Sequence, residues 1–430
     1  MIGVVIVLHL LILWILEFSP SPEFMIFPYL ARLGWVPYRE IVDHHFPGIF
    51  FAINWNLLGF VTAKGLHFLL LAVVGTTSAF IYFLTKKFYS QKAALLSVII
   101  FAFWQPIYGG SILWIDLFLP LLLLPALYFL LSKKWFLAGL LLGLAILCKQ
   151  NTILLVIPSA IVAFRNGKKG AIFFGGLIVP AIYLLIKLIV WQNWDDFWFW
   201  NVVFNLKHYA TLAGKFPSFN DLLKLIPPFI FILPVLYSKI SHKWVFGSWI
   251  LVLLLGFAPR FGLEHFQASL PFMVILVAEF ISQQRAKVMG FALGLGILST
   301  GWFYLAPQPY LQTRYFDQET LEVVQYVLDN TTPGDTIFLL GAQPHIYALT
   351  NTVPPGRYFT FHMPWLLKFN GDKALEAVSN NPPKLVIFDI NSRVDGLSIR
   401  QYANFLVEYV EGSYQRIESI GGYSIYASRN

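Results

Sequence analysis

Long apolar stretches separated by short loops restrict the folds open to the first 305 residues more than any other feature. A helix needs about 20 predominantly apolar residues to cross a bilayer, and fewer when it is broken. We therefore expect an all-α polytopic membrane region with about eleven transmembrane helices. Their expected positions are 2–16, 66–85, 93–108, 112–131, 135–148, 151–164, 170–191, 222–238, 244–258, 267–282 and 288–305. The stretch 47–62 is either a further span or a helix at the membrane interface.

The composition excludes a soluble protein and a nucleic-acid partner. Hydrophobic residues make up 57% of the chain and charged residues 12%, whereas soluble domains carry about 25% charged residues. Residues 1–305 hold 21 Lys and Arg against 10 Asp and Glu, while residues 306–430 hold 9 against 12. The positive charge thus belongs to the membrane region, where basic loops set the topology. The single Cys148 excludes an intrachain disulfide and is expected to be a buried thiol.

Basic residues alternate between loops, and this alternation predicts the orientation. With the N-terminus in the cytoplasm, five short inner loops hold 12 Lys and Arg residues, and the alternate short outer loops hold only Lys149. Basic loops stay on the cytoplasmic side. We therefore expect a multi-pass protein of the cell (plasma or inner) membrane. The 12 basic residues are Lys86, Lys87, Lys92, Lys133, Lys134, Arg165, Lys168, Lys169, Lys239, Lys243, Arg285 and Lys287.

The same orientation gathers the acidic residues on the outer face. Only Glu279, of the ten acids before residue 306, is expected towards the inside. Acidic residues contribute little to topology, so this clustering is independent of the orientation argument. The other nine are Glu17, Glu23, Glu40, Asp43, Asp116, Asp195, Asp196, Asp221 and Glu264.

The pattern changes at about residue 306, where we expect a small extracytoplasmic α/β domain to begin (306–430, after a membrane domain at 1–305). Residues 318–330 have helical spacing, and a Thr-Pro-Gly-Asp turn follows at 332–335. Strand-like runs occupy 336–340, 382–389 and 423–427. The chain has no Gly-rich phosphate loop and no internal repeat.

The first outer loop, within residues 17–65, holds the densest group of candidate site residues. Ionisable groups beside a bilayer are expensive to place and are functional by default. We take Glu23 and Asp43 as candidate catalytic carboxylates, and Glu40, His44 and His45 as candidate contacts to an acceptor or a metal. Imidazole and carboxylate suit Zn or Mn, although adjacent histidines on a regular helix or strand would face different sides. No cofactor is required, and a divalent metal is left open.

Four further residues interrupt the apolar stretches near the outer face. Asp116 lies about one turn inside an otherwise apolar span, where a charge costs ~3 kcal/mol unless it has a partner. Lys149 separates two short helices, and a broken helix can present a cation to an anion. Arg260 and His265 lie in the last outer loop. Cations at this boundary are suited to a lipid phosphate.

These residues and motifs resemble the GT-C superfamily of membrane glycosyltransferases over nearly the whole chain. The likeness is greatest to the bacterial branch related to dolichyl-phosphate-mannose-protein mannosyltransferases and to the lipid A aminoarabinose transferase. The motifs that carry it, in order, are the acidic first loop with Val-Pro-Tyr-Arg-Glu (36–40) and His-Phe-Pro-Gly (45–48), the lone Asp116, 143–150, 264–271 and 332–337.

The resemblance implies transfer of a sugar from a polyprenyl-phosphate donor to a glycan, lipid or protein acceptor outside the bilayer, with inversion. In the family a carboxylate of the first outer loop acts, often in an Asp-Glu pair that reads Pro22-Glu23 here. Glu23 or Asp43 would then be the general base, ~3 Å from the acceptor hydroxyl, with Asp116 positioning the acceptor or the base. Lys149, Arg260 and His265 would bind the donor phosphate. The family's His-Tyr pair is His265-Phe266 in this chain.

Two other function classes remain open at this point. A transporter or flippase of lipid-linked glycans would be expected to show paired halves with matching broken helices, and the sequence shows no such symmetry. A non-catalytic member that binds a lipid-linked glycan is consistent with the missing Asp before Glu23. Covalent transfer of the sugar separates the enzyme from both alternatives.

Overall fold

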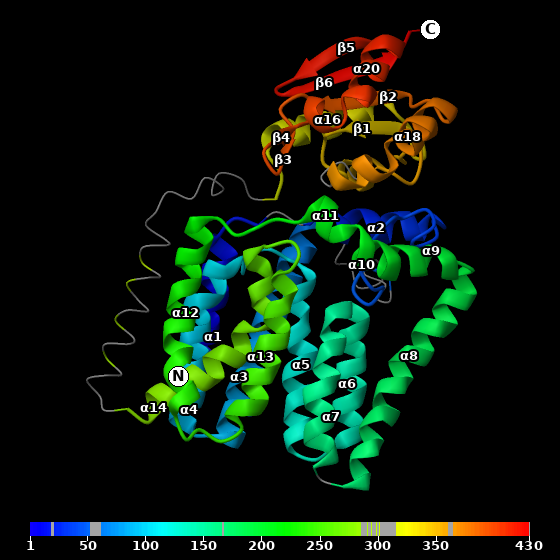
Figure 1. Cartoon of the computed structure of the whole chain (residues 1–430). Coiled ribbons are helices and arrows are strands. Elements are labelled where there is room, and N and C mark those ends of the chain that lie inside the picture. Colours follow the sequence, from blue (N-terminus) through cyan, green and yellow to red (C-terminus); the bar gives the residue numbers. More distant parts are fainter. Residues whose placement is uncertain are drawn as a thin grey trace.

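The computed structural model describes residues 1–18, 21–51, 62–165, 167–284, 315–359 and 364–429, together with 290, 294, 298 and 301. A bundle of upright helices carries a smaller α/β region at one end (Figure 1). We call the helix ends and loops beneath this region the capped end. The capped end comprises residues 23–49, 105–116, 148–151, 192–220 and 255–269.

Helices occur at ten of the eleven positions expected from the apolar stretches. Several begin or end in a short 3-10 turn, which explains why the apolar runs exceed the α-helical segments. The elements are α1 (Ile2–Ile15), α3 (Ala63–Phe88), α4 (Gln91–Trp104) with η1 (Gln105–Tyr108), α5 (Ile115–Leu131), α6 (Trp135–Cys148), η2 (Gln150–Leu155) with α7 (Val156–Phe164), η3 (Lys168–Ala171) with α8 (Ile172–Trp191), α12 (Phe219–Tyr237), α13 (Lys243–Leu254) with η5 (Leu255–Phe257), and η6 (Leu263–Ala268) with α14 (Leu270–Ser282).

Length limits which of these helices count as complete spans. Within the described ranges, the helices at 63–88, 168–191 and 219–237 are long and apolar enough to cross a membrane, and six other apolar helices are shorter. The expected class, mainly helical with a small C-terminal sheet, is confirmed, but the expected count of about eleven spans is not. The predicted span 288–305, most of 47–62 and the domain boundary at 305 lie outside the described residues.

Short helices lie across the capped end, between the bundle and the C-terminal region (Figure 1). They are rich in aromatic residues and lack the single long apolar run of a span. Trp200 and Phe204 are buried there against Phe369 of the C-terminal region. The elements are α2 (Glu23–Arg32), α9 (Trp194–Trp198), η4, a π-helix (Phe199–Phe204), α10 (Asn205–Lys207) and α11 (Tyr209–Ala213).

The C-terminal region is built on a four-stranded sheet with the order β1-β2-β6-β5. β1 runs parallel to β2, and β6 is antiparallel to both β2 and β5. The helix and three strands expected from the sequence are all found, whereas β5 and the β3–β4 hairpin were not expected. The elements are α16 (Gln318–Asn330), β1 (Ile337–Leu340), α17 (His345–Thr350), α18 (Pro364–Asn380), β2 (Leu385–Asp389), β3 (Arg393–Val394), β4 (Leu397–Ser398), α19 (Ile399–Tyr402), α20 (Asn404–Ser413), β5 (Tyr414–Ile420) and β6 (Tyr423–Ser428).

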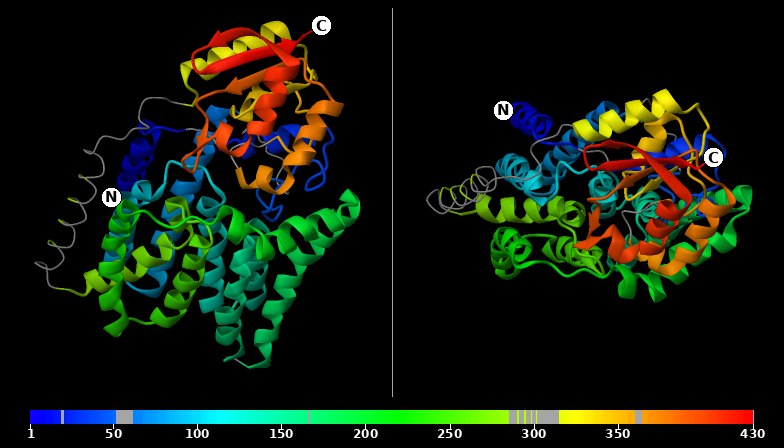
Figure 2. Two further views of the ribbon diagram at one scale, coloured as in Figure 1. Left: turned by 45° about the horizontal axis from the view of Figure 1, so that its top comes forward. Right: turned by 90° about the horizontal axis from the view of Figure 1, so that it is seen from above.

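The C-terminal region packs directly on the capped end, part of which it covers when seen from above (Figure 2). The Tyr29 hydroxyl of α2 donates a hydrogen bond of 3.0 Å to the Thr352 carbonyl. The ring of Phe369 lies 5.5 Å from that of Phe204. The C-terminal region therefore forms a lid over the capped end.

Candidate active site

A buried carboxylate at the capped end meets two nitrogen-bearing side chains. Asp116, the second residue of α5, is 1% exposed. The Lys149 ammonium donates to both of its oxygens at 2.7 Å, and His265 Nδ1 lies 2.8 Å from Oδ2. Lys149 Nζ and His265 Nδ1 are 3.3 Å apart. Three expected site residues therefore meet at one point, which we call the Asp116 cluster.

A break in the helical chain places Lys149 in this cluster. α6 ends at Cys148, and Lys149 is extended (φ −149°, ψ 113°) before η2 begins. Its backbone N–H donates to the Ala145 carbonyl, and its own carbonyl accepts from the Thr152 N–H. The break thus leaves this backbone satisfied, which a helix end inside a membrane requires. The helix break thus presents the Lys149 ammonium to the Asp116 carboxylate.

A second group, Asp43 with His44 and His45, lies in the first loop and is called the loop cluster. One oxygen of Asp43, Oδ1, accepts from the His44 backbone N–H at 2.8 Å and lies 2.9 Å from His45 Nδ1. The other oxygen, Oδ2, is buried without a hydrogen-bond partner among the described residues. The two imidazole rings lie 4.1 Å apart. The expectation that adjacent histidines would diverge was wrong, because a bend rather than a regular strand or helix carries them.

One amide side chain ties the loop cluster to the helix break beside the Asp116 cluster, and a second ties it to α10. Gln150, the neighbour of Lys149, donates to the His44 carbonyl at 2.9 Å, and Asn205 of α10 donates to the same carbonyl at 2.8 Å. The Gly48 N–H donates to the Leu147 carbonyl at 2.7 Å. A Cβ at Gly48 would lie only 2.5 Å from that carbonyl oxygen, so a larger residue would push the loop away. The two clusters therefore form one continuous polar site.

The surroundings of His44 favour its neutral form. Burial, followed by the nearby charges of His45, Arg260 and Lys149, holds the pKa of His44 well below its usual value of 6.5. Tyr209 packs on His44 with ring centroids 4.7 Å apart, and burial raises the pKa of its hydroxyl to about 12. The His44 imidazole and the Tyr209 hydroxyl are therefore neutral at pH 7. Asp43 is the carboxylate that the loop cluster offers for proton or metal chemistry.

The loop cluster also has a donor set that fits a divalent ion. One ligand atom each from Asp43, His44 and His45 can be chosen within 4.8 Å of one another. Two imidazoles and a carboxylate suit zinc or manganese, and three protein ligands leave a position for substrate in catalytic zinc sites. The orphaned Oδ2 of Asp43 is the observation that favours such an ion.

Arg260 contacts other partners than Lys149 and His265, with which its place in the sequence grouped it. Both of its terminal nitrogens contact the Asp395 carboxylate of the C-terminal region at 2.8 Å. Lys215 approaches the same carboxylate at 3.5 Å. Arg260 Nη1 also donates to the Ala213 carbonyl at the end of α11 at 3.2 Å. Tyr209 at the start of α11 packs on His44, so α11 joins this contact to the loop cluster.

The two remaining expected residues take different positions. Glu23 is buried at the first position of α2, where a carboxylate is favoured by the helix dipole. Its neighbour Phe24 stacks on Phe118 of α5, so Glu23 lies where α2 meets the helix that carries Asp116. Glu40 is exposed and accepts a hydrogen bond of 2.6 Å from the Val36 N–H. Glu40 therefore stabilises the turn formed by residues 36–40.

Several residues of the site were not expected from the sequence. Asn205, Tyr209, Lys215 and Asp395 lie in segments with neither a periodic apolar pattern nor a lone charge in an apolar run. One signal was readable for Asp395, since Asp-Gly between short strand segments is typical of a two-residue hairpin turn. That signal locates the turn but does not identify Arg260 and Lys215 as the partners of Asp395.

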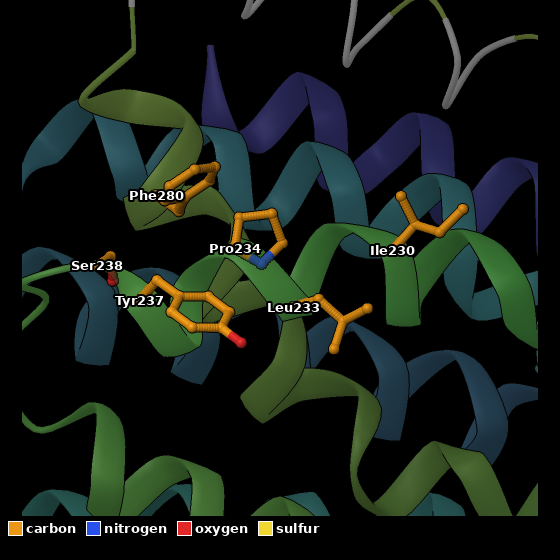
Figure 3. A pocket seen from close by; sticks show the side chains of 6 residues that line it. All are labelled: Ile230, Leu233, Pro234, Tyr237, Ser238 and Phe280. Carbon is orange, nitrogen blue, oxygen red and sulfur yellow. The ribbon is translucent and has the colours of Figure 1, made fainter.

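The surface of the bundle also carries open grooves. One of about 580 Å³ is lined by Ile230, Leu233, Pro234, Tyr237 and Ser238 of α12 with Phe280 of α14 (Figure 3). It lies at the end of α12 away from the capped end. Its lining is almost entirely apolar, so it offers surface for lipid and no group for chemistry.

Comparison with known proteins gives one family and one fold. Residues 46–191, which include Asp116 and Lys149, match the family described as dolichyl-phosphate-mannose-protein mannosyltransferase. No curated protein matches the sequence. The structure resembles ArnT from Cupriavidus metallidurans in the apo state, with a TM-score of 0.64 at 12% identity, covering 99% of this chain and 97% of that chain.

The same fold appears in two further solved structures. ArnT bound to undecaprenyl phosphate gives a TM-score of 0.62 at 11% identity, covering 99% of this chain and 97% of that one. The oligosaccharyltransferase AglB from Archaeoglobus fulgidus, in complex with an inhibitory peptide and a dolichol-phosphate, gives 0.56 at 12%, covering 100% and 74%. The resemblance inferred from the sequence is thus confirmed: this is an integral membrane protein with the GT-C glycosyltransferase fold, and its residues 46–191 match the mannosyltransferase family.

Proposed function

We propose that the protein is a glycosyltransferase that moves a sugar from a polyprenyl-phosphate donor to a glycan, lipid or protein acceptor at the capped end. The observation that carries this proposal is the buried Asp116 cluster joined to the loop cluster. Similar structures bind undecaprenyl phosphate and dolichol-phosphate, and their fold supports the same donor class here.

The Asp116 cluster suits the leaving group. In a single displacement the acceptor oxygen bonds to the anomeric carbon, and the bond from that carbon to the phosphate oxygen breaks. The electron pair stays on the phosphate, whose charge then needs cationic donors held in place beforehand. Lys149 supplies a cation and His265 a ring nitrogen for hydrogen bonding, and Asp116 holds both in position.

The loop cluster suits the proton acceptor. The acceptor oxygen attacks the anomeric carbon from the face opposite the phosphate, and this attack inverts that carbon. A base on the same side takes the proton of the acceptor hydroxyl. Asp43 has one oxygen fixed by the His44 N–H and His45, and a second oxygen without a hydrogen-bond partner among the described groups. We assign the base to Asp43, with Glu23 of α2 as the second candidate.

A divalent ion is a second candidate role for the loop cluster. Asp43, His44 and His45 would hold it, and the ion would supply positive charge to the reacting oxygens. Metal analysis of the purified protein tests this role. Stoichiometric zinc or manganese that is absent from His45→Ala supports it, whereas a metal-free and fully active wild type contradicts it.

Transfer by purified protein in lipid nanodiscs is the test of the proposed function. The protein receives radiolabelled polyprenyl-phosphate sugar and a membrane extract that contains glycans, lipids and proteins as acceptors. We expect labelled product from the wild type, and rates lower by about 10²–10⁴ for Asp43→Asn. Asp195→Asn, an exposed acid of α9 outside both clusters, is the matched control and should retain the rate.

The outcomes of this assay separate the three function classes. Covalent transfer supports the enzyme, and its absence with every acceptor contradicts it. Movement of the labelled donor across vesicles without transfer identifies a flippase. Tight binding of the donor without transfer or movement identifies a non-catalytic binding protein.

A further inference from the structure

The tip of the β3–β4 hairpin places a carboxylate between two cations of the membrane region. Asp395 and Gly396 form the two-residue turn, with φ of 51° and 82°. Positive φ at both positions is the geometry of a type I′ turn, which fixes the direction of the hairpin. The Arg260 guanidinium meets both Asp395 oxygens at 2.8 Å, and Lys215 Nζ lies 3.5 Å away. We call these three residues the hairpin contact.

The two cations are neighbours because their backbones pair. The Lys215 N–H donates to the Pro259 carbonyl at 3.1 Å, and the Phe261 N–H donates to the Lys215 carbonyl at 2.9 Å. This pairing belongs to the membrane region and does not depend on the hairpin. Two like charges held side by side attract an anion. In this structure the anion is Asp395.

The hairpin contact adjoins the proposed site for the sugar. Arg260 also donates to the Ala213 carbonyl at 3.2 Å, and Ala213 is the last residue of α11. Tyr209 begins the same helix, and its ring packs on His44. α11 thus joins the hairpin contact to the loop cluster.

A guanidinium fork binds phosphate in the same bidentate manner as carboxylate. The Asp395 and Arg260 side chains remain 30% and 27% exposed, and that of Lys215 52%. Exposed ion pairs contribute little and exchange partners readily. The contact therefore combines the chemistry of an anion site with a weak, replaceable occupant.

We propose that Lys215 and Arg260 form a phosphate site which Asp395 fills until a phosphate-bearing ligand displaces it. Given the proposed function, the ligand is the polyprenyl phosphate released after transfer, once it has left the Asp116 cluster. Docking of the hairpin and binding of the phosphate then exclude one another. By linkage, each weakens the other by the same factor.

A second ion pair between the same two regions supplies a matched control. Arg357 of the C-terminal region contacts Asp196 of α9 at 3.3 Å. Arg357→Gln loosens the C-terminal region without uncovering Lys215 or Arg260. It separates a specific competition from a general loosening of the lid.

The test measures binding of undecaprenyl phosphate to the full chain in nanodiscs. We expect Asp395→Asn to bind it about 3- to 10-fold more tightly, since a competing charge is removed. Arg260→Gln should bind at least ~10-fold more weakly, and adding Asp395→Asn to Arg260→Gln should then give no gain. Arg357→Gln should bind like the wild type. Parallel titrations with inorganic phosphate and with unphosphorylated polyprenol distinguish a site for free phosphate from one that needs the lipid.

Hydrogen exchange of residues 392–398 gives an independent readout. Undecaprenyl phosphate should accelerate exchange of this hairpin in the wild type and leave it unchanged in Arg260→Gln. The inference is overturned if Asp395→Asn binds no more tightly than the wild type, or if Arg357→Gln gains as much affinity. A wild type that binds no polyprenyl phosphate contradicts the proposed function itself, whereas normal binding without competition contradicts this inference alone.

Discussion

The Asp116 cluster and the hairpin contact contain similar groups in different surroundings. Each pairs one Asp with two nitrogen-bearing side chains, at 2.7–2.8 Å around Asp116 and 2.8–3.5 Å around Asp395. The Asp116 side chain is 2% exposed and the Asp395 side chain 30%. A buried ion pair cannot lose a member without leaving an uncompensated charge, but an exposed pair can. Burial therefore makes the Asp116 cluster a fixed part of the site, whereas exposure makes the hairpin contact replaceable.

The largest effect on the transfer rate is expected from a substitution in the loop cluster, and this substitution should affect stability little. Asp43→Asn should slow sugar transfer by about 10²–10⁴ because the assigned base is lost. The thermal midpoint should change little, since the amide keeps one oxygen for the His44 N–H. Single-turnover rates and thermal unfolding in detergent measure both quantities. A rate loss explained entirely by unfolding would remove Asp43 from the chemistry.

Asp116→Asn should affect both stability and transfer. Removing one partner of a buried ion pair costs about 3–5 kcal/mol, and cationic donors that lose their orientation cost about 10²–10³ in rate. Denaturant unfolding in mixed micelles and the transfer assay measure the two losses. If Asp116→Asn were as stable as Asp395→Asn, the contrast between the two groups would fail.

Asp395→Asn should change stability by less than about 1 kcal/mol, because its partners are exposed to solvent and screened. Raising salt from 0.1 M to 1 M shortens the Debye length from about 10 Å to 3 Å. Hydrogen exchange of residues 392–398 should therefore quicken with salt in the wild type. The same rise in salt should leave the hydrogen-exchange protection around Asp116 unchanged. Equal salt sensitivity of the two regions would refute the distinction between them.

The pH dependence of the hairpin contact should be confined to acid. Burial alone would raise the pKa of Asp395, but the hydrogen bond and charge of Arg260, with Lys215, hold it below its usual value. A carboxyl with a lowered folded pKa adds stability above its unfolded pKa, about 3.9. That stability is lost as the pH falls through the folded value. Hairpin exchange should thus be constant from pH 7 to 5 and rise below about pH 4, and Asp395→Asn should not show this rise.

Apolar stretches and basic loops were sufficient to locate the helices of the bundle. Lys133 and Lys134 mark a turn between α5 and α6, and Lys86 and Lys87 end α3, as their place in the loops predicts. The short elements between Trp194 and Ala213 were not foreseen. Their aromatic side chains pack against the C-terminal region, so tertiary contacts decide their structure.

The site was foreseen residue by residue but not as an arrangement. Asp116, Lys149 and His265 each stood out as a polar residue near the outer ends of apolar runs, yet their contact joins segments 33 to 149 positions apart. Arg260 was grouped with His265 because the two are close in sequence. Backbone pairing with Lys215 directs Arg260 to Asp395 instead, and no local pattern reports such a pairing.

The most direct measurement is single-turnover transfer from a radiolabelled polyprenyl-phosphate sugar, with the anomeric configuration of the product determined. Wild type and Asp395→Asn should both give inverted product, while Asp43→Asn and Asp116→Asn should lose at least ~10² in rate. Transfer at the wild-type rate by Asp43→Asn and Asp116→Asn, or no transfer by the wild type to any acceptor, would contradict a catalytic site built on the two buried clusters.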